Sequence, residues 1–489
     1  MKNLACLMGL IVVAGVTCFC FVSAFSEDVS LGPPAGERER AVERAARAEL
    51  PGGVQAPRGV VLVTVDTLRA DHLGCYGHPQ VLTTALDRLA SGGQLFGNAI
   101  SQSSTTTPSH ASLMTGLHVQ DHNVYSNFAA LGDGAETLAE TLADHGFATF
   151  GLVNMRHLNP EVGNLSQGIN DFVRSSEVEG ARQSVDSLLY WLDGIGERPF
   201  FAWLHLADVH TPYQPPAPYS RMYYEGDEGA SGKRSLERVM PLLPRHMSDH
   251  PFLRKWLRGV TDLKWVMAQY KGAVTYVDDE LGRLMGELSE RGLLERTAMV
   301  VTSDHGENLG EHDMFFVHTG LYEQTVRVPL LTYFPGAGHQ GVQINEVVEL
   351  VDVLPTVLEY LELPPPVGIR GRSLWPLIRG DVSDERIALS EHAGKNLVAL
   401  RSRRYKYIRH LKTKSLQPSY PFKRGREELY DLRSDPSELR NLIRERPAVL
   451  KQFQEELRAR RGERLDLGVG DSELSAETIT VLKSLGYIR

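Results

Sequence analysis

The sequence predicts an α/β fold, in which a mixed or parallel β-sheet is flanked by helices and is followed by a small C-terminal antiparallel sheet with a helix. Two observations support this prediction. Apolar runs alternate with helical patterns along most of the chain, and from about Ile387 short alternating stretches replace the long helical patterns. The first run, GVVLVTVD at 59–66, is typical of a strand buried on both faces of a parallel sheet. Runs at 147–153, 200–206 and 297–303 each follow a helical pattern, which indicates a doubly wound arrangement.

The segment after Ile387 has no long helical pattern until near its end. The short alternating stretches ALSEH, LVALRSRRYKYIRH and EELYDL predict antiparallel strands, and PAVLKQFQEELRARRG predicts a final helix. We therefore divide the folded part into an α/β catalytic domain at 58–385 and a C-terminal α+β subdomain at 386–489 that packs on it.

The N-terminal 25 residues differ from the rest of the chain. Lys2 precedes an uncharged apolar run, and small residues follow at 22–24, which is typical of a signal peptide; the run is also long enough for a membrane anchor. Residues 26–57 have too few large apolar side chains to fold alone and predict a flexible spacer. We expect an exported protein of the periplasm or cell envelope, and a membrane tether through the N-terminus stays open.

The composition and charge of the chain limit the kinds of partner that it can bind. The chain has 489 residues, of which 42% are hydrophobic and 23% charged, so it can bury a sizeable core. The formal net charge of -9 offers no basic face for nucleic acid, and we expect no nucleic-acid partner.

Polar groups follow the predicted strands at the points where the strands end. Asp66 follows the first run, Asp304 and His305 follow the fourth, and Asp208 and His210 follow the third. Ligands of open α/β sheets bind at this edge, and two carboxylates with an imidazole suit a divalent metal ion. Taken singly, Asp66 is equally suited to capping a helix, and the other groups to turns or polar loops.

A hydroxyl-rich stretch, TTTPSHASLMTG at 105–116, predicts a helix that starts at Ser109 and ends at Gly116. Unpaired N–H groups at the start of that helix would favour an anion or an alkoxide nearby. One of the threonines is thus a candidate nucleophile. The alternative is that Thr107 or Ser109 simply caps the helix.

Several segments, in this order along the chain, resemble the sulfatase family of the alkaline-phosphatase superfamily. The resemblance extends from about Arg58 to the end and implies an alkaline-phosphatase-like fold. The segments that carry it are VDTLRADHLGCYG at 65–77, TTPSHASLMTG at 106–116, VTSDHGENLGEH at 301–312, HTGLYEQTVRVPLL at 318–331, and then VDVLPTVLEYL, GRSLWPL, RYKYI and ELYDLRSDPSELRNL.

The resemblance assigns roles to particular residues. Asp66, Asp304 and His305 fall on metal-ligand positions, and Thr106 falls on the position of the Cys or Ser that the family converts to formylglycine. The remaining assignments are four histidines: His210 near the leaving group, His318 where the family often has a sulfate-contacting Lys, His110 in place of the family's Arg, and His157 as a further substrate contact.

Two departures from the family pattern shape the predicted reaction. Thr106 cannot become an aldehyde, and a threonine ester must be cleaved by water, which favours phosphorus over sulfur by a narrow margin. Thr67 replaces a second carboxylate beside Asp66. With His305 in the set, we expect one divalent ion, with Mn²⁺ or Zn²⁺ favoured and Ca²⁺ or Mg²⁺ left open.

The predicted function is that of a metal-dependent hydrolase that cleaves a phosphate monoester, diester, phosphonate ester or sulfate ester through Thr106. The expected substrate is an anionic small-molecule or glycan ester. Two alternatives remain, a sulfuric ester hydrolase without formylglycine and a sulfatase-like binding protein that has lost turnover. Residues 217–262 are interpreted as an insertion before a helix near 278, either a substrate lid or a surface excursion.

Overall fold

A computed structural model of the chain describes residues 49–50, 54–55, 57–230, 235–381, 384–392, 394, 396–415 and 421–462. The predicted leader at 1–25 and most of the predicted spacer at 26–57 lie outside these residues. Within the described ranges, no helix combines the length and the apolar character needed to cross a membrane.

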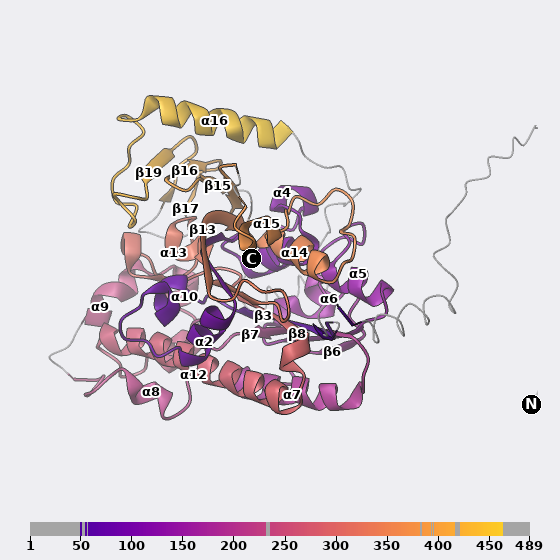
Figure 1. Cartoon of the computed structure of the whole chain (residues 1–489). Coiled ribbons are helices and arrows are strands. Elements are labelled where there is room, and N and C mark those ends of the chain that lie inside the picture. Colours follow the sequence, from indigo (N-terminus) through magenta and orange to yellow (C-terminus); the bar gives the residue numbers. More distant parts are fainter. Residues whose placement is uncertain are drawn as a thin grey trace, which may run out of the picture.

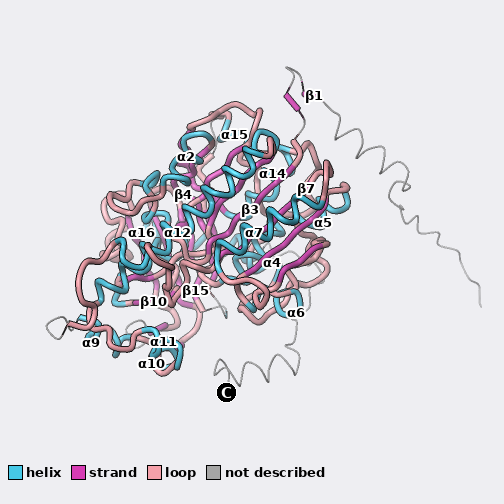
Figure 2. The backbone as a smooth tube through the Cα atoms, turned by 90° about the horizontal axis from the view of Figure 1, so that it is seen from below, coloured by secondary structure: helices cyan, strands magenta, loops and turns pink. Residues whose placement is uncertain are grey.

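A nine-stranded mixed sheet forms the centre of the molecule (Figures 1 and 2). Its strand order is β11-β4-β12-β8-β3-β7-β5-β6, and β13 pairs in parallel with β4. Only β11 and β12 of these strands run against the others. The strands are β3 (Gly59–Val65), β4 (Gln94–Ile100), β5 (Ala148–Val153), β6 (Asp171–Val173), β7 (Phe200–Leu206), β8 (Thr297–Thr302), β11 (Arg327–Val328), β12 (Leu330–Tyr333) and β13 (Val342–Glu349).

Each predicted apolar run becomes a strand of this sheet, with its ends shifted by at most one residue. All seven residues of β3 are buried, and successive side chains enter different cores. Val61 and Val63 join the core on one face, whereas Val60 and Leu62 join the core on the other. A strand covered on both faces needs apolar residues at every position, which explains the continuous run.

Helices cover both faces of the sheet (Figure 1). The helices α2, α7 and α12 supply one core, and α3, α5, α14 and α15 supply the other. Their bounds are α2 (Thr84–Gly92), α3 (Thr106–Thr115), α5 (Leu138–Asp144), α7 (Gly180–Gly194), α12 (Leu263–Glu290), α14 (Val353–Tyr360) and α15 (Trp375–Ile378). The shorter helices are α4 (Val119–His122), α6 (Pro160–Gly163), α8 (Tyr219–Met222), α9 (Ser235–Val239), α10 (Arg245–Ser248), α11 (Pro251–Trp256) and α13 (Glu323–Val326).

The prediction for residues 217–262 was wrong in one respect. The helix that follows them begins at Leu263 rather than near 278. Residues 217–262 contain α8 to α11, and side chains such as Leu253 and Trp256 are buried in the core with α12. The segment is thus packed structure rather than a solvated excursion.

The C-terminal subdomain is a four-stranded antiparallel sheet in the order β14-β15-β16-β19, as predicted. One face packs on α16, and the other packs on the catalytic domain around Tyr322. Its elements are β14 (Ala388–Glu391), β15 (Leu397–Arg401), β16 (Tyr405–His410), β19 (Glu427–Asp431) and α16 (Pro447–Gly462). Three small hairpins complete the strands: β1 (Glu49–Leu50) with β2 (Val54–Gln55), β9 (Asn308–Leu309) with β10 (Phe315–Val317), and β17 (Lys414–Ser415) with β18 (Pro421–Phe422).

One buried carboxylate, that of Glu428 in β19, joins the two domains. It accepts hydrogen bonds from His410 (2.8 Å) and Tyr430 (2.6 Å) of the subdomain and from Tyr322 (2.8 Å) of the catalytic domain. Burial alone would raise the pKa of Glu428, but these hydrogen bonds and the charge of Arg426 lower it to about 2.

We predict that Glu428→Gln lowers the free energy of unfolding by about 3 kcal/mol at neutral pH, because a pKa below the ordinary 4.5 stabilises the folded state above that pH. This stabilisation is lost as the pH falls from 4.5 towards 2. Urea unfolding at pH 7 and pH 3 should therefore show a gap between wild type and variant that narrows at pH 3. The control Glu445→Gln removes an exposed ion pair with Arg440 and should cost less than about 1 kcal/mol.

Candidate active site

Four buried ionisable side chains converge where three neighbouring parallel strands end. Asp66 follows β3, His205 is the sixth residue of β7, and Asp304 and His305 follow β8. His305 Nε2 lies 3.3 Å from Asp304 Oδ2 and 3.8 Å from Asp66 Oδ1, and His205 Nε2 lies 3.5 Å from Asp66 Oδ2. All four side chains are 0% exposed. We name these four residues the carboxylate cluster.

The carboxylate cluster is short of hydrogen-bond donors. Both side-chain oxygens of Asp66, Oδ2 of Asp304 and Nε2 of His205 have no hydrogen-bond partner among the described residues. Buried carboxylate oxygens without partners are costly, and a bound cation satisfies them. Ligand atoms of Asp66, Asp304 and His305 all lie within 4.8 Å of one another, so these residues fit a divalent metal ion.

The two carboxylates of the cluster interact strongly. Burial raises the pKa of Asp304 to about 6, with the charge of Asp66 adding to the effect. Burial acts on Asp66 in the same direction, but the nearby histidines, led by His210, hold its pKa well below the ordinary value. The folded protein thus keeps one carboxylate firmly charged, and a cation would favour the charged form of both.

The ring of His305 is oriented by its backbone. Its Nδ1 donates to the carbonyl of Gly306 (3.1 Å), which leaves the lone pair of Nε2 facing the two carboxylates. Burial lowers the pKa of His305, but Asp304 and Asp66 outweigh burial and raise it above its ordinary value. Without a cation the carboxylates thus favour a proton on Nε2; a metal ion would take the place of that proton, since the neutral imidazole in this orientation is suited to coordination.

Thr106 is the first residue of α3, and its Oγ1 lies 3.3 Å from His305 Nε2. The predicted helix start at Ser109 was therefore wrong by one turn. Pro108 lies inside the first turn, where its missing N–H group is tolerated. The helix ends before Gly116, whose φ of 68° is left-handed, as predicted.

The alternative that Thr107 or Ser109 caps α3 was also wrong. Thr105 occupies the cap position, and Ser109 Oγ donates to the carbonyl of Asp304 (2.7 Å). The N–H of Thr107 donates to Asn127 Oδ1 (2.9 Å), and that of Ser109 donates to the carbonyl of Thr105 (3.1 Å). The first turn is therefore less available to an anion than predicted.

His110 lies behind Thr106 and is fully buried. Its Nδ1 donates to the carbonyl of Thr106 (2.8 Å), and its Nε2 accepts from Thr64 Oγ1 (2.9 Å). Burial, with the charge of His205, lowers its pKa well below the ordinary value, so the ring is neutral. Because both nitrogens are occupied, His110 connects the first turn of α3 to β3. Its contact with substrate stays a prediction.

The other three predicted histidines lie around the carboxylate cluster. The ring of His318, after β10, lies 4.5 Å from that of His305 and 5.7 Å from that of His210, between centroids. His318 Nδ1 and His157 Nε2 are buried without a partner among the described residues. Burial lowers the pKa of His157 to about 3 and that of His318 well below its ordinary value. Both rings are neutral, and their substrate roles stay predictions.

Two groups at the site were missed by sequence reasoning. His205 lies within an apolar strand run, where a lone histidine in a strand buried on both faces is the available signal. Glu307 lies two residues beyond His305; its Oε2 accepts from Thr211 Oγ1 and Tyr213 Oη, each at 3.1 Å. Burial raises the pKa of Glu307 to about 7, against the charges of His210 and His305.

Two residues weighed in the sequence lie beside the cluster. Thr67, at the position of the family's second carboxylate, donates its hydroxyl to the carbonyl of Val209 (2.9 Å). Asp208 accepts from the N–H of Ala181 (3.2 Å) at the start of α7, and burial raises its pKa to about 6. The contact of Asp208 is therefore with the start of α7 rather than with the carboxylate cluster.

Comparison with known families agrees with this geometry. Residues 58–363, more than half of the chain, match the family described as Sulfatase. The chain belongs to the sulfatase family. Residues 310–463 also match the family described as N-sulphoglucosamine sulphohydrolase, C-terminal. This sulfatase-family chain is an ester hydrolase of the alkaline-phosphatase superfamily.

Individual relatives carry different activities. An arylsulfatase of Clostridium perfringens is 27% identical over 78% of this chain and 90% of its own length. The phosphonate monoester hydrolase of Agrobacterium radiobacter has the same fold, with a TM-score of 0.66 and 22% identity over 86% of this chain and 98% of that one. An enzyme solved with its substrate D-glucosamine-2-N,6-O-disulfate also shares the fold, with a TM-score of 0.64 and 20% identity over 88% and 98% of the two chains.

We predict that the purified protein retains a divalent ion through gel filtration and that Asp66→Asn and Asp304→Asn remove it. His205→Ala should weaken metal binding by roughly 10- to 100-fold, because its orphaned nitrogen faces Asp66. Elemental analysis and dialysis against metal buffers measure both effects. Asp208→Asn is the matched control, and equal metal loss in this variant would contradict the assignment.

Proposed function

We propose that this sulfatase-family protein hydrolyses anionic esters through Thr106 and a single divalent metal ion, with phosphoesters and phosphonate esters preferred over sulfate esters. The observation that carries the proposal is the position of Thr106 Oγ1, 3.3 Å from His305 Nε2, beside carboxylate oxygens that have no partner among the described residues. Export to the periplasm or cell envelope, which the leader predicts, is part of the same proposal.

Asp66, Asp304 and His305 would hold the metal, with His205 as a further ligand. When bound, the ion supplies positive charge to the nucleophile and to the group being transferred. The donor set contains imidazole nitrogen as well as carboxylate oxygen, which favours Mn²⁺ or Zn²⁺ over Ca²⁺ or Mg²⁺.

The side chains of the protein carry the group transfer. Thr106 Oγ1 gives up its proton to solvent and attacks the phosphorus or sulfur atom in line, while the bond from that atom to the leaving oxygen breaks. His210 Nδ1 donates to the carbonyl of Thr211 (2.7 Å), so Nε2 is free to deliver a proton to the leaving oxygen. Water then cleaves the threonine ester and regenerates the hydroxyl.

Two further groups support charge on the transferred group. His318, held neutral by burial, can donate a hydrogen bond from its unpartnered Nδ1 to an anionic oxygen. Most N–H groups in the first turn of α3 are occupied or absent, so the helix contributes through its dipole rather than through several free donors.

The ranking of phosphorus over sulfur rests on the nucleophile. A hydrated aldehyde can expel its ester by elimination, whereas a threonine ester needs attack by water at the central atom. Sulfate-ester hydrolysis is the second candidate, favoured by the likeness to an arylsulfatase. Anionic glycan esters remain within the proposed substrate range, since an enzyme of the same fold has a disulfated glucosamine as its substrate.

We predict that Thr106→Val lowers kcat/KM by roughly 10³-fold or more, because the isosteric side chain lacks the attacking oxygen. Thr106→Ser keeps a hydroxyl and should retain most of the activity. Aryl phosphate, phosphate diester, phosphonate ester and aryl sulfate are to be assayed side by side with the metal-loaded protein. Full activity of Thr106→Val would refute the nucleophile, and a preference for aryl sulfate would reverse only the ranking. No turnover of any substrate by wild type would favour the binding-protein alternative.

We predict that the effect of His210→Ala depends on the leaving group. Substrates with a poorly acidic alcohol should lose roughly 10²- to 10⁴-fold in kcat/KM, because the leaving oxygen needs a proton in the transition state. The 4-nitrophenyl ester, whose leaving group needs no proton, should lose far less. His145→Ala, at a histidine after α5 that is remote from the cluster in sequence, is the control. An equal loss for both leaving groups would show that His210 does not donate the proton.

A further inference from the structure

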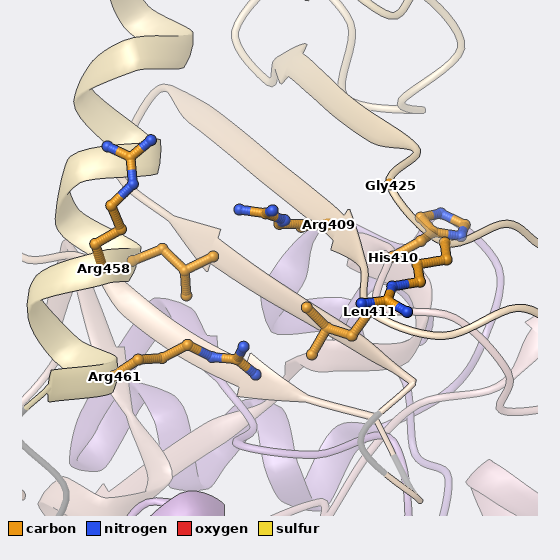
Figure 3. Close-up of a pocket in the computed structure, with 8 residues that line it drawn as sticks. Arg409, His410, Leu411, Gly425, Arg458 and Arg461 are labelled. Carbon is orange, nitrogen blue, oxygen red and sulfur yellow. The ribbon is translucent and has the colours of Figure 1, made fainter.

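A positively charged hollow lies away from the carboxylate cluster, between the C-terminal sheet and α16. Its volume is about 570 Å³. Figure 3 shows Arg409 reaching from β16 towards α16, and Arg461 reaching from α16 towards the sheet. We name this hollow the arginine pocket; its lining residues are Arg409, His410, Leu411, Arg424, Gly425, Leu457, Arg458 and Arg461.

The four arginines of the arginine pocket have no ion-pair partner in the part of the chain that the structure describes. Arginines around them are paired: Arg404 with Asp431 at 2.8 Å, Arg426 with Glu428 at 3.1 Å, and Arg460 with Glu456 at 2.6 Å. The whole chain carries nine more acidic than basic side chains (61 against 52). Among the described residues, four guanidinium groups thus surround one hollow without an ion-pair partner, and an anion bound there would reduce the repulsion between them.

The floor of the arginine pocket is fixed by hydrogen bonds. His410 is buried; its Nε2 donates to Glu428 Oε1 (2.8 Å), and its Nδ1 accepts from the N–H of Lys423 (3.2 Å). The N–H of Gly425 donates to the carbonyl of His410 (3.0 Å), and Gly425 has a left-handed φ of 83° that favours glycine. The turn that carries Arg424 is therefore anchored before any ligand arrives.

The arginine pocket lies at the end of the C-terminal sheet where β14 contacts residues 102 and 103 of the catalytic domain. β14 and β16 both run antiparallel to β15, so Glu391 and His410 end their strands at the same edge. The N–H of Glu391 donates to the carbonyl of Gln102, and its carbonyl accepts from Ser103 Oγ, each at 2.8 Å. This pairing leads directly into the segment that ends at Thr106.

The end of α16 is attached to the same region. Gln120, in α4, donates to the carbonyl of Arg460 (3.0 Å). Burial raises the pKa of Glu391, and the charge of Arg461 is the largest effect that opposes it. Arg461 therefore acts electrostatically on Glu391, whose backbone is hydrogen-bonded to Gln102 and Ser103, a few residues before Thr106.

We propose that the arginine pocket is an accessory anion site that takes a second sulfate or phosphate group of an oligosaccharide whose ester is cleaved at Thr106. This inference rests on the proposed function and deepens it by naming a substrate that carries several anionic groups. Guanidinium groups form paired hydrogen bonds with sulfate and phosphate oxygens, and the four arginines, from β16, the turn before β19 and α16, suit one such group. A small aryl ester has no second group to place there.

The shape and charge of the surroundings favour this ligand over other polyanions. The arginines line a hollow rather than a protruding face, whereas anionic membranes attract projecting basic segments. Nucleic acid would extend beyond the hollow over a chain whose net charge is -9, which opposes its binding. A saccharide whose anionic groups are separated can place one of them against the arginines without bringing further negative charge near the acidic surface of the protein.

The test compares two double variants of equal charge change, with folding checked by melting temperature and metal content. Arg409→Gln with Arg461→Gln neutralises the arginine pocket, and Arg404→Gln with Arg440→Gln removes two paired arginines of the same subdomain. Calorimetry measures the Kd of a heparin-derived hexasaccharide and of its desulfated form. We expect the pocket variant to weaken binding of the sulfated hexasaccharide by about tenfold or more and the control by less than about twofold.

Binding, rather than turnover, is measured, so failure of the proposed function at Thr106 leaves this readout unchanged. Equal Kd changes in the two variants, or no binding of the hexasaccharide to wild type, would overturn the accessory site. Inorganic sulfate that binds as tightly as the hexasaccharide would show a site for free anions instead. Binding to phosphatidylglycerol vesicles that the pocket variant loses, without any loss for the hexasaccharide, would assign the arginines to a membrane surface.

Discussion

Two carboxylates, Asp66 and Asp304, are buried side by side at the ends of the paired strands β3 and β8, with three of their four oxygens unpartnered among the described residues. In water each carboxyl group would ionise at neutral pH. In the protein interior, ionising both of them side by side costs free energy, because the charges repel and are not hydrated. The nearby imidazoles relieve part of this repulsion, as the lowered pKa of Asp66 shows. The arrangement of the surrounding groups fits a cation held between the two carboxylates.

The segment that leads into α3 is attached to this charged centre by hydrogen bonds. The hydroxyls of Ser101 and Ser109 both donate to the carbonyl of Asp304, and Ser101 Oγ also lies 2.9 Å from Ser109 Oγ. His110 holds the carbonyl of Thr106 from the opposite side. A hydroxyl mounted this way loses little further freedom on reaction, which is the advantage of a preorganised site. The C-terminal subdomain adds support through Glu391, so both domains position one short segment.

Sequence reasoning recovers the parts of this structure that depend on repetition and position. Continuous apolar runs locate β3, β5, β7 and β8, because a strand covered on both faces tolerates few polar residues. The end of such a strand is also where ligands bind, which predicts that Asp66, Asp304 and His305 lie at one edge of the sheet.

What sequence reasoning misses depends on contacts between distant segments. His205 looks like part of an apolar run, and only the neighbouring β3 shows that its ring faces Asp66. Pro108 suggested a helix start one turn too late, although proline is tolerated throughout the first turn. The arginine pocket combines residues of β16, the turn before β19 and α16, and no local pattern separates its unpaired arginines from paired ones such as Arg404.

Family membership fixes the fold and the class of bond, but the chemistry at position 106 is local. A threonine offers one oxygen and a methyl group, and both are enclosed here, since the residue is 1% exposed. In the proposed reaction, the covalent ester at Thr106 is released by attack of water, whereas an aldehyde hydrate carries its own second hydroxyl. A phosphoryl group bound to Thr106 leaves at a useful rate only if the site also stabilises the attack of water on that group. A cation held by the carboxylate cluster would serve both steps, because attack by threonine and attack by water develop negative charge on the same transferred group.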